Sequence, residues 1–540
     1  MKIKMIDFFA METTRLRLSI IYTTILSGCC YGFLIFIINN AANVIFQDIS
    51  VELHLICFYV VVCIIFYISQ NYSLSRSITL ATEIIGLMRL RILDKIRHSE
   101  LLFIEKKGYS DIHMRLTQDF NTIFHAVPVL VAALDDLITV IVVYTYIAMI
   151  SFETFVVVIF FFLASIGYFY TKYFIIKEQM IQSGKKETEF LGIINGVLKG
   201  FKQIKIHFQK NEDLFKDIVA VSEESEKYKT RGLITYREHT MKMMIFHFFM
   251  YATLLFVMPI YFEVLRGTIL KVFAALLFAQ GPLEMIFRSF ATIAMTNVAV
   301  TNLQDLEEEL DHHEGVTIEQ VSPIKDFQEI SLKSALFQYK DSQGGVSFQS
   351  GPVDLTIRKK DVLFIVGGNG SGKSTLLKLL TGLYPTLPPG QVLLNNEPIT
   401  SQTYPAYRQL FSIIFTDYYL FKKLYGLESV DENTVMKMLK TMLLHRKTKF
   451  SNNQFSNTDL STGQRKRLAC IEALLEDKPI YIFDEWTADQ DPEFRKFLYD
   501  KILQDLRDAG KTVIIVTHDD RYFHYADTVI TMEDGKIKQK

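Results

Sequence analysis

A glycine-rich run in the second half of the chain has the residue types that bind a nucleoside triphosphate. It reads Gly367-Gly368-Asn369-Gly370-Ser371-Gly372-Lys373-Ser374, after the apolar run Val362–Val366 and before the helix-like run Thr375–Leu383. Small residues let backbone N–H groups curl around phosphate oxygens, and the following helix directs its positive end at the same anion. In this pattern the lysine reaches the β- and γ-phosphates, and the last hydroxyl holds Mg²⁺. A chance glycine turn would not explain the complete GxxxxGK[ST] pattern between a strand and a helix.

Two carboxylates and a histidine follow this loop at the ends of apolar runs. Ile480–Phe483 leads into Asp484 and Glu485, and Thr512–Val516 is followed closely by His518. Asp484 can hold the water shell of Mg²⁺, and Glu485 can orient or deprotonate the water that attacks the γ-phosphate. His518 can hydrogen-bond the γ-phosphate and help to hold that water. Each signal is weak alone, because buried strand ends often carry a carboxylate, but their order after a phosphate-binding loop makes them specific together.

The phosphate-binding loop, the two carboxylates and the histidine can meet only in an α/β domain whose strands end at the same edge of one sheet. From about residue 327, short strand-like runs alternate with helix-like runs, and Asp534-Gly535 is a turn signal between the last two short apolar runs. The sequence therefore predicts an α/β domain with the phosphate-binding loop near its start. The expected strands are Asp361–Val366, Gln391–Leu394, Phe411–Phe415, Ile480–Phe483, Thr512–Val516 and Thr528–Met532.

The first half of the chain is predicted to be an α-helical membrane domain. The chain is 49% hydrophobic and contains 43 phenylalanines, which is high for a soluble protein. Leu18–Ile38 is uncharged, long enough to cross a bilayer, and too long for the core of a signal peptide. Six membrane-spanning helices are expected, at Leu18–Ile38, Leu53–Ser69, Val129–Ile150, Phe155–Tyr173, Ile245–Val264 and Ile269–Phe290.

The loops between these spans predict the topology. The long loops 71–126 and 174–244 are rich in Lys and Arg, whereas two of the short loops have neither. Lys and Arg concentrate in cytoplasmic segments, so both termini and both long loops should be cytoplasmic. Arg266 and Lys271 are a mild exception in the third outer loop. Apolar residues at three-to-four spacing, without turn clusters, favour helices that extend into the cytoplasm over two small soluble insertions.

The net charge and the spacing of cysteine and histidine argue against a nucleic-acid partner and against a metal site. The net charge of -1 does not indicate a nucleic-acid partner, and the five cysteines lack metal-ligand spacing. The run Glu307–Glu314 contains His312 and His313, but adjacent residues on a helix point about 100° apart. A solvated helix end is therefore expected there rather than a metal site.

The predicted domains are a transmembrane domain at 1–310, a linker at 311–326 and a nucleotide-binding domain at 327–540.

A few polar side chains inside the spans are candidates for contact with a transported substrate. Asp135 and Asp136 lie near the inner end of the third span, where a carboxylate should face a cavity or a partner rather than lipid. The pair could bind a cationic substrate or be structural. Glu284 and Arg288, four residues apart, could pair with each other. His247 is interpreted as structural rather than as a proton carrier.

The run Leu460-Ser461-Thr462-Gly463-Gln464 closely matches the LSGGQ signature of ATP-binding-cassette (ABC) proteins, before a helix at Arg465–Leu475. Together with the phosphate-binding loop, the carboxylates and the histidine, it makes the chain resemble an ABC half-transporter of the exporter fold (type IV). The resemblance implies a homodimer in which each ATP lies between the loop of one subunit and the signature of the other. It implies ATP contacts for Gly367, Asn369, Gly370, Gly372, Lys373, Ser374, Thr375, Thr416, Ser461, Gly463, Gln464 and Asp491, adenine stacking on Tyr339, Mg²⁺ binding by Ser374 and Asp484, and catalysis by Glu485 and His518.

Three departures from the family pattern narrow the resemblance. Thr416, or its neighbour Asp417, stands where the family has a glutamine that contacts Mg²⁺ or water. The only tryptophan, Trp486, follows the second carboxylate, where a small residue is usual. The third departure is the run Asp519-Asp520-Arg521-Tyr522-Phe523 after His518. The strings FTD, DEWTADQDP and THDDRYF resemble the cyclic-peptide and siderophore-peptide exporters of bacterial inner membranes. Short coupling helices are expected near Lys107–Met114 and Lys210–Phe215.

The function implied is ATP-driven export of a small, cyclic or non-ribosomal peptide by a homodimer in the bacterial inner membrane. The expected partners are a second copy, the peptide and the lipid bilayer, with no nucleic acid. Alternatives on the same fold are a siderophore importer and a lipid flippase. A nucleotide-gated channel and a soluble ABC ATPase are further alternatives, and the six apolar spans argue against the soluble ATPase.

Overall fold

The structure is a computed structural model, and its described residues form two compact units. One unit comprises residues 1–97 and 105–312, and the other comprises residues 98–104 and 313–540. The predicted linker at 311–326 lies largely outside the described residues, as do residues 1–14. The described residues are 15–46, 53–262, 268–313, 324, 327–341, 344–427 and 430–538.

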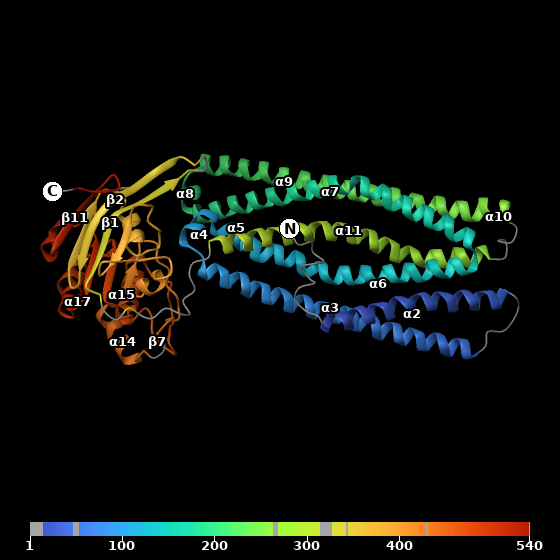
Figure 1. The fold of residues 1–540 in the computed structure, drawn as a ribbon, viewed down its shortest axis with the longest axis horizontal. Coiled ribbons are helices and arrows are strands. Elements are labelled where there is room, and N and C mark those ends of the chain that lie inside the picture. The colour runs from blue at the N-terminus through green and yellow to red at the C-terminus, as the bar shows by residue number, and fades with distance from the viewer. Residues whose placement is uncertain are drawn as a thin grey trace. The chain divides into compact units, whose positions relative to one another are not determined.

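Six long helices build the first unit (Figure 1), and α7 lies along α9 while α6 packs beside both α11 and α2. A buried apolar core between α6, α7, α9 and α11 holds them together. The long helices are α2 (Arg15–Phe46), α3 (Leu53–His98), α6 (Phe120–Ile150), α7 (Phe152–Lys199), α9 (Phe208–Ala252) and α11 (Ile269–His312). The short ones are α4 (Leu101–Lys107), α5 (Tyr109–Met114), α8 (Phe201–Ile206), α10 (Met258–Tyr261) and the π-helical turns η1 (Arg115–Asp119) and η2 (Thr253–Val257).

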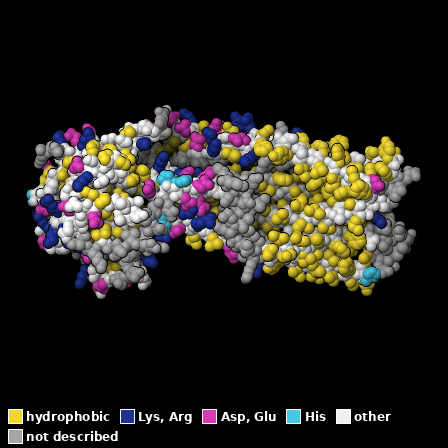
Figure 2. Space-filling model, in the orientation of Figure 1, with side chains coloured by type: hydrophobic (Ala, Val, Ile, Leu, Met, Phe, Trp, Pro, Cys, Tyr) yellow, Lys and Arg dark blue, Asp and Glu magenta, His cyan; other side chains and the backbone are white. Residues whose placement is uncertain are grey.

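A helix occupies each of the six predicted spans. Among the described residues, five helical stretches are long and apolar enough to cross a membrane, and the sixth, Phe152–Tyr168, is apolar but shorter. Figure 2 shows hydrophobic side chains covering a long stretch of the visible face of this unit, with charged side chains gathered mainly outside it. Apolar side chains exposed over such an area need lipid around them. The unit is therefore a membrane domain.

The predicted helical extensions of the spans are confirmed. Helix α3 continues to His98 and α7 continues to Lys199, well past their apolar parts. One coupling-helix prediction is wrong, because Lys210–Phe215 lies inside α9. The short helix is instead α8, where Gly200 ends α7 and the extended backbone of His207 precedes α9. The other predicted coupling helix, Lys107–Met114, largely coincides with α5.

The acidic run at the end of α11 is exposed to solvent at Glu308 and Asp311, as expected, and two of its other carboxylates are also paired with cations. Glu307 accepts from Arg91 and Lys95 at 2.9 Å each, and Glu309 accepts from Lys107 at 2.5 Å. The sequence could not reveal this pairing, because the cations lie about 200 residues earlier in the chain. No group of three or more potential metal ligands was found among the described residues.

Two sheets form the framework of the second unit. The antiparallel sheet has the order β2-β1-β4-β5, and the larger sheet has the order β12-β11-β3-β10-β9-β6, parallel except for β12. The first contains β1 (Glu329–Lys340), β2 (Val346–Arg358), β4 (Gln391–Leu394) and β5 (Glu397–Pro398). The second contains β3 (Val362–Gly367), β6 (Phe411–Ile414), β9 (Ile480–Asp484), β10 (Thr512–Val516), β11 (Thr528–Glu533) and β12 (Lys536–Lys538).

Successive side chains of the central strands point to opposite faces of the sheet, so the core has two layers. On β3, Leu363 and Ile365 face a core shared with β1, β2 and α12, while Val362 and Phe364 face a core shared with α15. All six predicted strands are confirmed, and the predicted Asp534-Gly535 turn joins β11 to β12. The helices are α12 (Lys373–Leu380), α13 (Tyr404–Arg408), α14 (Glu432–Thr441), α15 (Thr462–Leu475), α16 (Pro492–Phe497) and α17 (Gln504–Asp508), and a hairpin pairs β7 (Phe450–Ser451) with β8 (Gln454–Phe455).

Residues 98–104 group with this second unit although they precede it by more than 200 positions. Leu101 and Leu102 pack against the buried cluster of Phe337, Leu379 and Tyr384. The backbone N–H of Glu100 donates to the carbonyl of His313 at 3.2 Å. A short segment of the first long loop is thus built into the α/β unit.

Candidate functional site

The glycine-rich loop has the backbone that an anion cradle requires. Gly367, Gly370 and Gly372 have φ angles of +149°, +79° and +97°, which side chains disfavour. A Cβ at Gly367 would also lie 2.3 Å from the carbonyl oxygen of Met532. The loop ends at the N-terminus of α12, so its free N–H groups and the helix dipole point to one place.

Lys373 lies folded over this loop. Its ammonium donates to the carbonyls of Gly367 and Gly368 at 2.9 and 2.8 Å. Burial lowers the pKa of Lys373, and the charges of Glu485 and Asp484 oppose that shift. Among the described residues, no anion pairs with this largely buried cation at hydrogen-bond distance, and two neutral carbonyls are its partners. This is the electrostatic condition for binding a phosphate.

A pocket of about 1060 Å³ opens over the loop. Tyr339 on β1 lines one side, and its hydroxyl lies 3.4 Å from Thr375 Oγ1 and 3.3 Å from the Tyr384 hydroxyl. Phe348, the cross-strand partner of Tyr339 on β2, lines the pocket as well. Sequence reasoning missed Phe348, which only the strand register brings beside Tyr339. Phe337 is buried and stacks on Tyr384 at 4.4 Å, outside this pocket.

The predicted Mg²⁺ ligands meet at the base of the pocket. The Ser374 hydroxyl donates to Asp484 Oδ2 at 3.2 Å. Burial raises the pKa of Asp484, and the hydrogen bond from Ser374 opposes that shift. A hydroxyl and a carboxylate are hard oxygen donors that suit Mg²⁺, which takes its other ligands from water and nucleotide phosphates. The residues therefore fit the ion, and when bound it would neutralise charge on the phosphates.

Of the two residues that could replace the missing glutamine, Thr416 lies at the pocket. Thr416 lines the pocket, and a backbone hydrogen bond from Thr416 reaches the Asp484 carboxylate. Asp417 is exposed and is not among the residues that line the pocket. These positions favour Thr416 for the contact with Mg²⁺ or water, and that role stays a prediction.

Glu485 and His518 come together from neighbouring strands. Glu485 follows β9 and His518 follows β10, and His518 Nε2 lies 3.4 Å from Glu485 Oε1. Glu485 also lines the pocket that holds the loop. Its backbone has a φ of +52°, a left-handed conformation that costs a non-glycine residue ~1–2 kcal/mol. Strain of this kind, in a carboxylate directed at a phosphate pocket, is typical of catalytic positions.

The signature residues are held by a separate set of contacts. Ser461 is the N-cap of α15, and its backbone N–H donates to Gln464 Oε1 at 3.3 Å. The carbonyl of Gly463 accepts from Gln490 Nε2 at 2.9 Å, and a Cβ at Gly463 would lie 2.6 Å from the carbonyl oxygen of Asp489. Ser461, Gly463 and Gln464 are absent from the residues that line the pocket over the glycine-rich loop.

Asp491 anchors the neighbouring segment. It caps α16 by accepting from the N–H of Phe494 at 2.8 Å, and it accepts from Arg467 of the signature helix at 2.8 Å. The hydrogen bond from Phe494, followed by the charge of Arg467, lowers the pKa of Asp491. One chain therefore presents two prepared surfaces, a phosphate loop and a signature helix, without joining them in one pocket.

The two candidate substrate carboxylates lie in the membrane unit. Asp135 on α6 accepts from Ser27 of α2 at 3.4 Å and from Gln70 of α3 at 3.5 Å. Its other oxygen, Oδ1, is buried without a partner among the described residues. Asp136 is half-buried beside it. Their predicted contact with substrate stays a prediction.

The chain is similar to ABC transporters in sequence and in fold. Residues 351–488 match the sequence model of the ABC transporter family. The energy-coupling factor transporter ATP-binding protein EcfA1 of Staphylococcus aureus (strain USA300) is 31% identical over 222 residues, which cover 38% of this chain and 79% of that protein. The ATP-binding protein SyrD of Pseudomonas syringae pv. syringae is 29% identical over 534 residues, which cover 96% of this chain and 93% of that protein. A solved bacterial Atm1-family ABC exporter with ATP bound has a similar fold, with a TM-score of 0.81 at 15% identity over 98% of this chain and 95% of that chain.

The fold and the site define a membrane-embedded transporter that binds and hydrolyses ATP. The chain belongs to the ABC transporter family, and its fold is that of an ABC exporter half-transporter. The predicted fold class, a six-helix membrane domain followed by an α/β ABC ATPase, is confirmed.

Proposed function

We propose that two copies of this chain form an ATP-driven exporter of small, cyclic or non-ribosomal peptides. One observation carries the two-copy proposal: the phosphate loop and the signature helix of a single chain do not share a pocket. ATP bound on Lys373 would then be completed by Ser461, Gly463 and Gln464 of the second copy. Closure of the two ATPase domains around ATP would open the membrane helices outward, and hydrolysis would reset them.

The chemistry at each site follows from the geometry of the chain. Lys373 and the loop N–H groups bind the phosphates, and Tyr339 stacks on adenine. Mg²⁺ would be held by Ser374 and Asp484, partly through water. Glu485 accepts the proton of the attacking water, and His518, 3.4 Å away, positions Glu485 and the γ-phosphate. Asp491 lies in the segment between β9 and α16, and this segment would connect the two ATP sites of the dimer.

The proposed location is the bacterial inner membrane, with both termini and the ATPase domain in the cytoplasm. Helices α3, α7 and α9 extend beyond their apolar spans, and these extensions are rich in Lys and Arg. Lys and Arg concentrate on the cytoplasmic side of a membrane, which supports this location. The peptide cargo is supported by the FTD, DEWTADQDP and THDDRYF strings. Asp135 and Asp136 remain proposed cargo contacts from the sequence.

Deletion of the gene from the bacterium that carries it tests this function. Mass spectrometry would compare peptides inside the cells and in the medium, with wild-type and Glu485→Gln copies restored separately. The account expects a peptide that accumulates inside the deletion strain and is released again only with the wild-type copy. A compound depleted from the deletion cells would instead indicate an importer. An altered lipid distribution or an ion flux retained by Glu485→Gln would indicate a flippase or a channel.

A further inference from the structure

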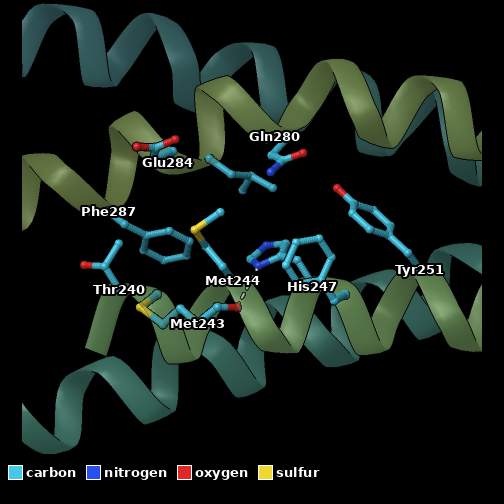
Figure 3. A pocket seen from close by; sticks show the side chains of 10 residues that line it. Thr240, Met243, Met244, His247, Tyr251, Gln280, Glu284 and Phe287 are labelled. Atoms are coloured by element: carbon cyan, nitrogen blue, oxygen red, sulfur yellow. Dashed lines mark hydrogen bonds between the residues drawn. The ribbon is translucent and has the colours of Figure 1, made fainter. Parts of the chain in front are cut away.

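A pocket in the membrane unit, separate from the ATP site, lies between α9 and α11 (Figure 3). Its volume of about 420 Å³ includes space open to solvent, so a ligand group would lie partly exposed over it. Figure 3 shows Met244, His247 and Gln280 directed into the space between the two helices, with Glu284 on α11 at its edge. Met243, Phe248 and Phe287 supply much of the apolar wall.

The position of Glu284 indicates an aqueous surface rather than a lipid-facing one. The side chain is exposed in the single chain, on a helix long and apolar enough to span a membrane. A carboxylate in lipid is costly, so such residues face a water-filled cavity or a partner. Among the described residues, no ion pair joins Glu284 to Arg288, the cation one turn away that the sequence suggested as its partner. The charge of Glu284 is therefore available to a ligand.

His247 presents a hydrogen-bond acceptor to the same space. Its Nδ1 lies 3.0 Å from the carbonyl oxygen of Met243, and the ring packs edge-on to Phe287 at 6.3 Å. A carbonyl can only accept, so Nδ1 carries the hydrogen and Nε2 of the neutral ring is an acceptor. The Tyr251 hydroxyl, in contrast, is directed to the carbonyl of Leu276 at 3.5 Å. Glu284 and His247 Nε2 therefore offer acceptors at the polar edge of the pocket, and the amide oxygen of Gln280 can offer a third.

The apolar wall contains two methionines, whose flexible thioethers adapt to ligands of different shape. The combination of one carboxylate, neutral acceptors and an adaptable apolar wall matches a cation attached to an apolar body.

We propose that this pocket binds a protonated amine or guanidinium carried on an aromatic or aliphatic group of the exported molecule. The inference rests on the proposed export function and narrows its cargo to amphipathic cationic peptides. Glu284 binds the cation, His247 Nε2 and Gln280 accept further N–H groups, and Met244, Phe248 and Phe287 contact the apolar part.

Equilibrium binding to the full-length protein in nanodiscs tests this proposal. The probes are dansylcadaverine, a primary amine on an aromatic group, and its neutral N-acetyl derivative, both followed by dansyl fluorescence against empty nanodiscs. The wild type is expected to bind the amine about tenfold or more tightly than the acetyl compound. Glu284→Gln should remove most of that difference, and Gln280→Leu should reduce it. The matched control is Glu308→Gln, the same change at an exposed position on the same helix.

Equal affinity of the two probes for the wild type would overturn the proposal. Retained discrimination in Glu284→Gln, or an equal loss in Glu308→Gln, would overturn it too. Thermal unfolding of each variant checks that the helices remain folded. ATP hydrolysis by the wild type is measured in parallel, because its absence would contradict the proposed transporter function, whereas hydrolysis without amine discrimination contradicts only the pocket.

Discussion

The ammonium nitrogen of Lys466 lies 2.9 Å from the carbonyl oxygen of Glu485. The same nitrogen donates to the carbonyl of Ala488 at 3.2 Å and pairs with Asp489 at 3.3 Å. Lys466 is 8% exposed and belongs to the signature helix α15, whereas Glu485 directly follows strand β9. One cation therefore ties the signature helix of the chain to the left-handed backbone of Glu485.

Replacing Lys466 tests this connection. Lys466→Met should lower kcat for ATP hydrolysis about tenfold or more, because the strained Glu485 backbone loses its restraint and the carboxylate its position. The Kd for ATP should stay near the wild-type value, and Lys466→Arg should recover part of kcat. Lys437→Met, at an exposed position on α14, is the control. A lower affinity for ATP with kcat unchanged would contradict a positioning role.

Glu485→Gln should bind ATP normally and lose at least about a hundredfold in turnover. The amide keeps the shape of the side chain but cannot accept the proton of the attacking water. Phosphate release and ATP binding, measured on the same preparation, separate the two effects. Glu397→Gln, an exposed change on β5, should behave as wild type. Near-normal hydrolysis by Glu485→Gln would rule out the assigned role.

The raised pKa of Glu472 should make the stability of the ATPase unit depend on pH. Burial on α15, followed by the charge of Glu476, raises its pKa from 4.5 to about 7. The folded state therefore binds more protons than the unfolded state between about pH 4.5 and 7, so Glu472 destabilises the fold increasingly as pH rises through that window. Glu472→Gln should stabilise the unit by ~1–2 kcal/mol at pH 8, and the gain should vanish near pH 4.5.

Trp486 provides the readout for that measurement. It is the only tryptophan of the chain, is 2% exposed and stacks on Phe483 at 4.0 Å. Its fluorescence therefore reports unfolding of the ATPase unit alone. Urea unfolding at several pH values would show a stabilisation that grows with pH, and a pH-independent effect of Glu472→Gln would contradict the buried-carboxyl account.

The sequence predicted those parts of the site whose signals are local. Gly367–Ser374, Asp484 and Glu485 are read from adjacent residues, because strand, turn and helix follow each other directly. Phe348 was missed because only the β1–β2 register places it beside Tyr339. The contacts of Lys466 were missed for a similar reason, since they join segments about twenty residues apart through the fold.

Membrane helices were likewise predictable from composition, whereas their packing was not. Apolar length indicated six spans, but the partner of a polar side chain depends on which helices are neighbours. Arg288 was a plausible partner for Glu284 by spacing, yet the described structure contains no such pair. The short helix near Lys210 was misplaced because Gly200, ten residues earlier, ends α7 and fixes the turn.

The central claim is that each ATP site is built from two copies of the chain, and mixed dimers test it directly. One subunit carries Lys373→Met, and the other carries Ser461→Asp, which keeps a good helix N-cap but sets a negative charge against the γ-phosphate. Ser461→Asn is the neutral capping control. Each variant alone should hydrolyse almost no ATP, and a differently tagged, doubly purified mixed dimer should recover up to about half of the wild-type rate, since one of its sites is complete.

A subunit with both substitutions, paired with a wild-type subunit, leaves neither site complete and should show no recovery. The decisive measurement is therefore the ATPase rate of the Lys373→Met and Ser461→Asp mixed dimer. Restored hydrolysis in that dimer is the predicted result, whereas a rate as low as that of either variant alone would contradict the two-copy site.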